Sequence, residues 1–108
     1  MSTHDILHRL SETLASRRNA DPETSYTAKL FAKGPDSILK KIGEESAELI
    51  MAGKEGKRLK VVWESTDVIY HVLVLLAYYD LGIEDVSQEM RRREGISGID
   101  EKAARGQK

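Results

Sequence analysis

The chain has 108 residues, enough for one small domain spanning residues 1–108, and 40% of them are hydrophobic while 32% are charged. Its net charge of -1 argues against a general nucleic-acid-binding surface, and the lack of cysteine excludes disulfides, thiolate metal sites and a cysteine nucleophile. The longest apolar run, residues 72–79, is too short to span a membrane, and residues 1–5 lack the regions of a signal peptide. We therefore expect a cytoplasmic protein with no nucleic-acid and no membrane partner.

Apolar residues at helical spacing, interrupted by glycines and prolines, predict an all-α chain. The expected helices cover residues 3–18, 25–34, 36–53, 58–81 and 83–93. Residues 53–58 carry two glycines and predict a turn between antiparallel helices. Residues 95–108 form a tail, which we expect either to be disordered or to be ordered and able to close over phosphates.

Carboxylates lie in pairs on both sides of this turn. Glu48 lies eight residues before Gly56 and Glu64 lies eight after it, while Glu45 and Asp67 are each eleven away. A hairpin centred on Gly56 would therefore place Glu48 opposite Glu64 and Glu45 opposite Asp67. Converging carboxylates raise one another's pKa, and a divalent cation relieves that cost. The spacing thus predicts an oxygen-ligand metal site for Mg²⁺, with Mn²⁺ as its substitute.

Each carboxylate pair adjoins an apolar stripe, which weakens the alternative of a solvated acidic face. Ile38, Ile42, Leu49 and Ala52 follow helical core spacing with Glu45 in line. The next helix has a matching stripe, made of Thr66, Ile69, Leu73 and Leu76. A carboxylate inside a core stripe is a local misfit, and such misfits are typical of functional sites.

The helix expected at 58–81 is apolar on nearly all sides in its second half, so one small chain can hardly cover it. We therefore expect a homodimer or larger assembly. Trp63 is expected to be a core or interface anchor. His71 shares a face with Glu64 and Asp67 and is expected either to orient a ligand or to be a hydrogen-bonded core histidine.

Basic residues are the expected phosphate contacts, although Lys40 and Lys41 each precede a glutamate by four and could instead form ion pairs within their helix. The candidates are Lys29, Lys40, Lys41, Arg92, Arg93 and Lys102.

The paired carboxylates, ExxE followed 15 residues later by ExxD, resemble the signature of the MazG-like all-α nucleoside triphosphate pyrophosphohydrolases. Within that superfamily the chain is most similar to the phosphoribosyl-ATP pyrophosphohydrolases, from about residue 7 to residue 105. The segments that carry the closer resemblance are SYTAKL at 25–30, ILKKIGEE at 38–45, DVIYHVLVLL at 67–76 and RREGISGIDEK at 92–102.

The resemblance implies a MazG-like helical bundle completed by homodimerisation. It also implies Mg²⁺-dependent hydrolysis of phosphoribosyl-ATP to phosphoribosyl-AMP and pyrophosphate, the second step of histidine biosynthesis. Phosphoribosyl-AMP cyclohydrolase would act next. Glu45, Glu48, Glu64 and Asp67 would hold the metal, and Glu44 would be a further ligand or the general base.

Two other readings fit the same residues. One is a housekeeping pyrophosphohydrolase that acts on dUTP or damaged nucleotides with the same metal chemistry. The other is a helical oligomerisation module whose carboxylates only form ion pairs with its lysines.

Overall fold

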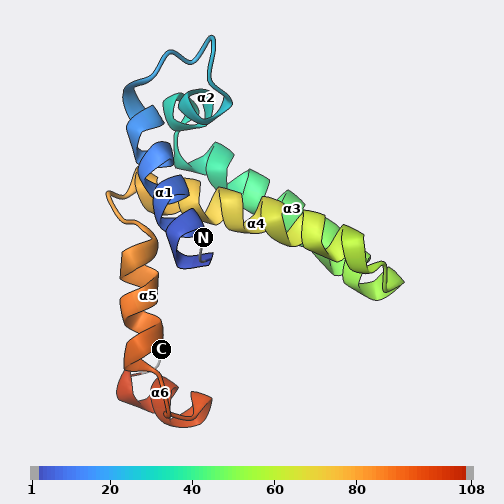
Figure 1. The fold of residues 1–108 in the computed structure, drawn as a ribbon, viewed down its shortest axis with the longest axis vertical. Coiled ribbons are helices and arrows are strands. Elements are labelled where there is room, and N and C mark those ends of the chain that lie inside the picture. The colour runs from blue at the N-terminus through green and yellow to red at the C-terminus, as the bar shows by residue number, and fades with distance from the viewer. Residues whose placement is uncertain (1–2, 107–108) are drawn as a thin grey trace.

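The computed structural model describes the backbone of residues 3–106 and the side chains of residues 6–106, and over this range the chain is all-α (Figure 1). The elements are α1 (Thr3–Ser16), η1 (Arg17–Asn19), α2 (Tyr26–Lys33), α3 (Pro35–Glu55), α4 (Arg58–Tyr78), α5 (Ile83–Arg92) and α6 (Gly98–Ala104). The predicted helices are confirmed with small shifts at their ends.

Helix ends coincide with the residues that favour them. The Ser25 side chain accepts a hydrogen bond from the Ala28 N–H at 3.1 Å and caps α2. Pro35 occupies the first turn of α3, where its missing N–H costs nothing. Gly56 ends α3 with φ of 72°, a left-handed conformation that glycine adopts readily. The turn predicted around Gly56 is therefore confirmed, and it joins the antiparallel pair α3 and α4.

The core lies where α1, α2, the start of α3 and the end of α4 meet. Its most deeply buried members are Ile38 and Val74, each 0% exposed. The whole cluster comprises Leu14, Leu30, Phe31, Ile38, Leu73, Val74 and Ala77. Beyond this core, the other half of the α3–α4 hairpin projects alone, and α5 and α6 project in a different direction (Figure 1).

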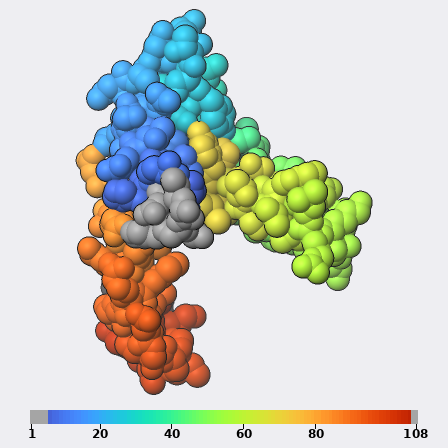
Figure 2. Space-filling model, viewed as in Figure 1, coloured from blue at the N-terminus to red at the C-terminus, as the bar shows by residue number. Residues whose placement is uncertain are grey.

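These projections make the molecule open for its size, as the space-filling view shows (Figure 2). The radius of gyration is 15.8 Å, whereas about 13 Å is typical of a compact domain of this length. The accessible surface is 7682 Å², against roughly 6,000 Å² for a compact monomer of this mass. The chain therefore exposes surface that a compact fold would bury.

Part of the exposed surface is one apolar stripe on α4, which we define as Leu59, Val62, Trp63 and Ile69, with exposed fractions from 47% to 61%. Of the stripe predicted on this helix, Leu73 is buried within the chain, whereas Thr66 and Ile69 are exposed. Trp63, 58% exposed, is not a core anchor of this chain. The reason is that helical spacing reveals an apolar face but not what covers it.

By length and composition alone, α4 could also cross a membrane. A single such helix is weak evidence for a span, because the core helix of a soluble protein can be equally long and apolar.

The tail is ordered over the described residues and folds back on α5. The side chain of Glu101 on α6 is 4% exposed and forms ion pairs with Arg92, Arg93 and Arg105. This cluster attaches α6 to the end of α5.

Candidate metal centre and adjoining cationic pocket

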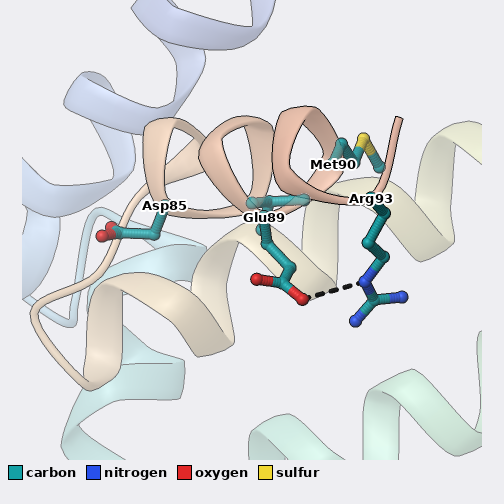
Figure 3. A pocket seen from close by; sticks show the side chains of 5 residues that line it. Asp85, Glu89, Met90 and Arg93 are labelled. Carbon is teal, nitrogen blue, oxygen red and sulfur yellow. Dashed lines mark hydrogen bonds and ion pairs between the residues drawn. The ribbon is translucent and has the colours of Figure 1, made fainter. Parts of the chain in front are cut away.

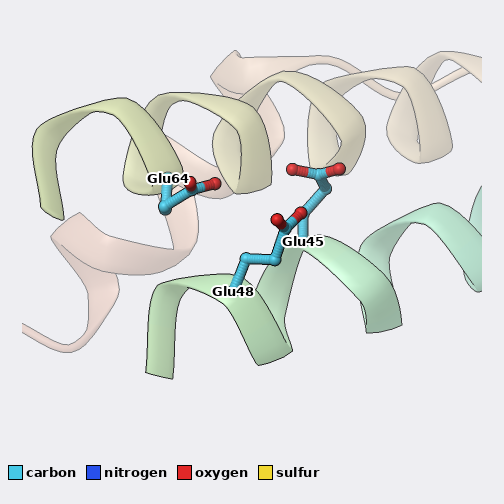
Figure 4. A group of neighbouring side chains, drawn as sticks. All are labelled: Glu45, Glu48 and Glu64. Atoms are coloured by element: carbon cyan, nitrogen blue, oxygen red, sulfur yellow. The ribbon is translucent and has the colours of Figure 1, made fainter. Parts of the chain in front are cut away.

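Three carboxylates converge between α3 and α4. Glu45 and Glu48 come from α3 and Glu64 comes from α4, and Figure 4 shows all three side chains directed into the space between the helices. One oxygen from each lies within 4.8 Å of the others. The predicted convergence of α3 and α4 carboxylates is therefore present for these three residues.

The surroundings of the three carboxylates differ in burial and charge. Glu45 is 8% exposed, and the Lys41 Nζ lies 3.7 Å from its carboxylate. Desolvation, followed by the charges of Glu48, Asp67 and Glu45, raises the pKa of Glu64, while Lys60 lowers it by less. Glu64 therefore carries the strain of like charges, which a bound cation would relieve.

Two other predicted site residues lie beside this group of three. Asp67 is exposed on α4, and its charge contributes to the raised pKa of Glu64. Glu44 is exposed on α3, and its Oε1 forms an ion pair with the Lys41 Nζ, 3.5 Å away. The ion pairing expected within α3 is thus centred on Lys41.

A pocket of about 230 Å³ adjoins the carboxylates, between α2 and α3. Its lining combines three lysines with hydroxyl groups and one carboxylate: Tyr26, Leu30, Lys33, Ser37, Lys40, Lys41 and Glu44. Lys41, which lines the pocket, also lies 3.7 Å from the Glu45 carboxylate, so the pocket and the candidate metal centre share this side chain. Ammonium groups here suit an anionic ligand such as phosphate.

A hydrogen-bond chain connects this pocket to α4. The Tyr26 hydroxyl lies 2.8 Å from the Nε2 of His71, and the Nδ1 of His71 lies 2.8 Å from the backbone carbonyl oxygen of Asp67. His71 is 6% exposed, and its ring lies edge-on to both Tyr26 and Tyr70. Of the two expectations for His71, the structure supports the hydrogen-bonded core histidine.

The remaining predicted phosphate contacts do not line this pocket. Lys29 is exposed on α2, and Lys102 is exposed on α6, which Figure 1 places at the far end of α5. Arg92 and Arg93 pair with Glu89 and Glu101. The Arg93 Nε lies 2.9 Å from the Glu89 carboxylate, and Figure 3 marks this contact. Both guanidinium groups are therefore already engaged by carboxylates of their own chain.

Four of the residues that line the pocket were not predicted from the sequence, the polar residues Tyr26, Lys33 and Ser37 and the apolar Leu30. A signal existed for one of them, since Ser37 shares an α3 face with Lys40, Lys41 and Glu44 at the spacing i, i+3, i+4, i+7. Lys33 and Tyr26 join this face only through the angle that α2 makes across Gly34.

The donor set fits a divalent cation. All three converging groups are carboxylates, and hard cations such as Mg²⁺ favour oxygen ligands. Desolvation, and then repulsion from Glu48, Asp67 and Glu45, raises the pKa of Glu64, and a cation would offset both. A cation centre next to an ammonium-lined pocket suits hydrolysis of a phosphate anhydride, with phosphates in the pocket and the scissile bond at the carboxylates.

The chain is similar to known proteins over most of its length. The profile of the family described as phosphoribosyl-ATP pyrophosphohydrolase matches residues 7–94. A protein of Dechloromonas aromatica named phosphoribosyl-ATP pyrophosphatase is 87% identical over 108 residues, 100% of both chains. Proteins of the same name from Aromatoleum aromaticum and Azoarcus sp. are 55% and 54% identical over 101 residues, 94% of each chain.

Proposed function

The chain belongs to the phosphoribosyl-ATP pyrophosphohydrolase family, and from this premise we propose that it hydrolyses phosphoribosyl-ATP to phosphoribosyl-AMP and pyrophosphate. This is the second step of histidine biosynthesis. The observation that carries the proposal is the convergence of Glu45, Glu48 and Glu64 beside a pocket with three lysines. In a helical module without activity, carboxylates that face one another across α3 and α4 would only repel, with no gain in stability.

Mg²⁺, with Mn²⁺ as its substitute, would be held by Glu45, Glu48 and Glu64, with Asp67 next to them. When bound, such an ion would neutralise charge on the phosphate oxygens and lower the pKa of the attacking water. Glu44 lines the pocket and precedes Glu45 on α3, and it is the candidate for a further ligand or for the general base that accepts the proton of this water.

Substrate phosphates are proposed to contact Lys40 and Lys41, together with Lys33. Lys41 also forms ion pairs with Glu44 and Glu45. The charge of Tyr26, followed by those of Glu44 and Glu45, raises the pKa of Lys41. Lys29, Arg92, Arg93 and Lys102 remain proposals as phosphate contacts, and the two arginines would have to exchange their present carboxylate partners for phosphate.

The working unit is proposed to be a homodimer in the cytoplasm that supplies phosphoribosyl-AMP to the cyclohydrolase acting next. Support comes from the α4 stripe and from the surface of roughly 1,700 Å² above that of a compact monomer, which exceeds the ~800 Å² that a standard interface buries on each partner. An open apolar groove between α1, α4 and α5 continues this stripe, and its lining includes Leu7, Ile69, Leu76 and Met90.

The decisive experiment measures pyrophosphate release with Mg²⁺ from phosphoribosyl-ATP, ATP, dUTP and dCTP at equal concentration. We expect strong preference for phosphoribosyl-ATP and loss of activity in excess EDTA. A preference for dUTP or dCTP would retain the metal chemistry but reject the substrate. Undiminished release in excess EDTA would reject the metal mechanism.

A further inference from the structure

The Tyr26 phenol is a polar group that the proposed chemistry has not used. It stands at the first residue of α2 and lines the pocket with Lys33, Lys40 and Lys41, and its oxygen interacts electrostatically with the Lys41 ammonium group. Its ring is half exposed, while its hydroxyl contacts buried His71 at 2.8 Å. One side of the hydroxyl is therefore fixed by the protein and the other faces the pocket.

The direction of each hydrogen bond in this chain follows from a single constraint. The backbone carbonyl oxygen of Asp67 can only accept, so the Nδ1 of His71, 2.8 Å away, must carry the proton. In neutral imidazole the Nε2 then has no proton and must accept from the Tyr26 hydroxyl. Partial burial raises the pKa of Tyr26 above its ordinary value, which keeps that proton in place near neutral pH.

The consequence concerns what Tyr26 can offer a ligand. Its single proton is committed to His71, so toward the pocket its oxygen presents only lone pairs. The three lysines of the pocket, in contrast, present only donors. The pocket thus holds two kinds of groups: the lysines can bind phosphate oxygens, and the Tyr26 oxygen can accept a proton from a hydroxyl or amino group.

We propose that Tyr26 is a specificity-determining residue that accepts a hydrogen bond from an O–H or N–H donor of the substrate, and that His71 is the residue that positions it. The inference rests on the proposed function for its substrate. That substrate offers donors of two kinds, ribose hydroxyls and the amino nitrogen of the base.

The first test does not depend on activity. The ring ¹⁵N shifts of His71 are recorded at about pH 8.5 and assigned among the three histidines of the chain with His71→Asn. We expect the neutral tautomer protonated on Nδ1. The tautomer protonated on Nε2 would overturn the proposal, because the Tyr26 proton would then be free to point into the pocket.

The second test uses Tyr26→Phe, with Tyr70→Phe as its matched control. Tyr70 also loses a hydroxyl that is hydrogen-bonded, at 2.5 Å to Thr27, but it does not line the pocket. Tyr26→Phe should raise the KM for phosphoribosyl-ATP about three- to tenfold, the worth of one neutral hydrogen bond, with kcat within about twofold. Tyr70→Phe should leave KM unchanged, and equal effects of the two variants on KM would overturn the proposal.

Direct binding identifies which donor Tyr26 recognises. Calorimetry compares wild type and Tyr26→Phe for AMP, 2′-deoxy-AMP, 3′-deoxy-AMP, IMP and ribose 5-phosphate. A preference for AMP over a deoxy analogue, present in wild type and lost in the variant, indicates a hydroxyl of the nucleoside. The same pattern against IMP indicates the amino group, and a loss confined to ribose 5-phosphate indicates the second ribose.

The two proposals fail separately. If no probe distinguishes wild type from Tyr26→Phe, the role of Tyr26 is overturned even where phosphoribosyl-ATP is hydrolysed. If wild type releases no pyrophosphate from phosphoribosyl-ATP, the proposed function fails, while the tautomer and the binding differences still report on Tyr26.

Discussion

Glu48 is the exposed member of the carboxylate centre, so its replacement perturbs the centre with little effect on packing. We expect Glu48→Gln to reduce Mg²⁺ affinity and pyrophosphate release by at least about 100-fold, since even groups that only support a metal ligand are worth 10- to 100-fold. Calorimetric Mg²⁺ titration and steady-state kinetics measure the two effects. Glu55→Gln is the control, because Glu55 is an exposed α3 carboxylate that pairs with Lys60 outside the centre. Full Mg²⁺ affinity in Glu48→Gln would contradict the assignment.

Glu64 links the same centre to pH. Its pKa in the folded protein is raised from 4.5, so its neutral form stabilises the fold below that pH, and this contribution is lost as pH rises through the folded pKa. Without metal, Glu64→Gln should therefore have the same Tm as wild type near pH 4.5 and a higher Tm at neutral pH, where the Glu64 carboxylate is charged. Saturating Mg²⁺ should reverse the order, because only wild type retains the ligand. Thermal melts across pH, with and without Mg²⁺, measure the sign of the Tm difference between Glu64→Gln and wild type in each condition. Identical pH profiles of the two proteins without metal would contradict the raised pKa assigned to Glu64.

Among the helices, α2 and α6 offer a matched pair of caps. Ser25 accepts from the Ala28 N–H and Ser97 accepts from the Asp100 N–H, both at 3.1 Å. Ser25→Ala should reduce the free energy of unfolding by about 1 kcal/mol, because α2 contributes Leu30 and Phe31 to the core. Ser97→Ala should leave it unchanged and only speed amide exchange in α6, since α6 lies outside the core. Urea denaturation and hydrogen exchange separate the two, and a global loss in Ser97→Ala would contradict this division.

The contact between α5 and α6 depends on charge. Arg92 and then Arg93 lower the pKa of Glu89 to about 2, so its contribution is present above 4.5 and is lost as pH falls toward 2. Glu101 is the buried partner of the same arginines. Glu101→Gln should speed amide exchange in α6 about tenfold or more, because it leaves three guanidinium groups without their shared carboxylate. Unchanged exchange there would show that apolar contacts alone hold α6.

Sequence alone predicts a part of this site that depends on distances along one hairpin. The turn at Gly56 fixes which α3 residues oppose which α4 residues, so the meeting of Glu48 and Glu64 follows from counting. The pocket depends instead on how α2 packs against α3, and that angle has no sequence period. The exposure of Ile69 could not be predicted either. The sequence shows that this face of α4 is apolar, but it does not show which surface covers that face.

At the scale of the whole molecule, the α4 stripe predicts self-association. Wild type should sediment as a dimer at micromolar concentration, and Ile69→Glu should sediment as a monomer with a lower Tm, because a charge would enter an apolar interface. Trp63 fluorescence should shift to longer wavelength in that variant, as the indole becomes wet. Ile99→Glu is the control, since Ile99 is 84% exposed on α6 and lies outside the stripe. A monomeric wild type would contradict the prediction.

The placement of the centre within a single hairpin also bears on the order in which the molecule assembles. Glu45 and Glu64 are only 19 positions apart (64 minus 45), so closing the α3–α4 turn costs little chain entropy and can precede most other contacts. Their mutual repulsion would then oppose the earliest step of folding, and divalent cations or protons would accelerate that step. Association through α4 must wait until this hairpin exists. In a newly made chain, the carboxylate centre would thus form first and association with a second copy would come last.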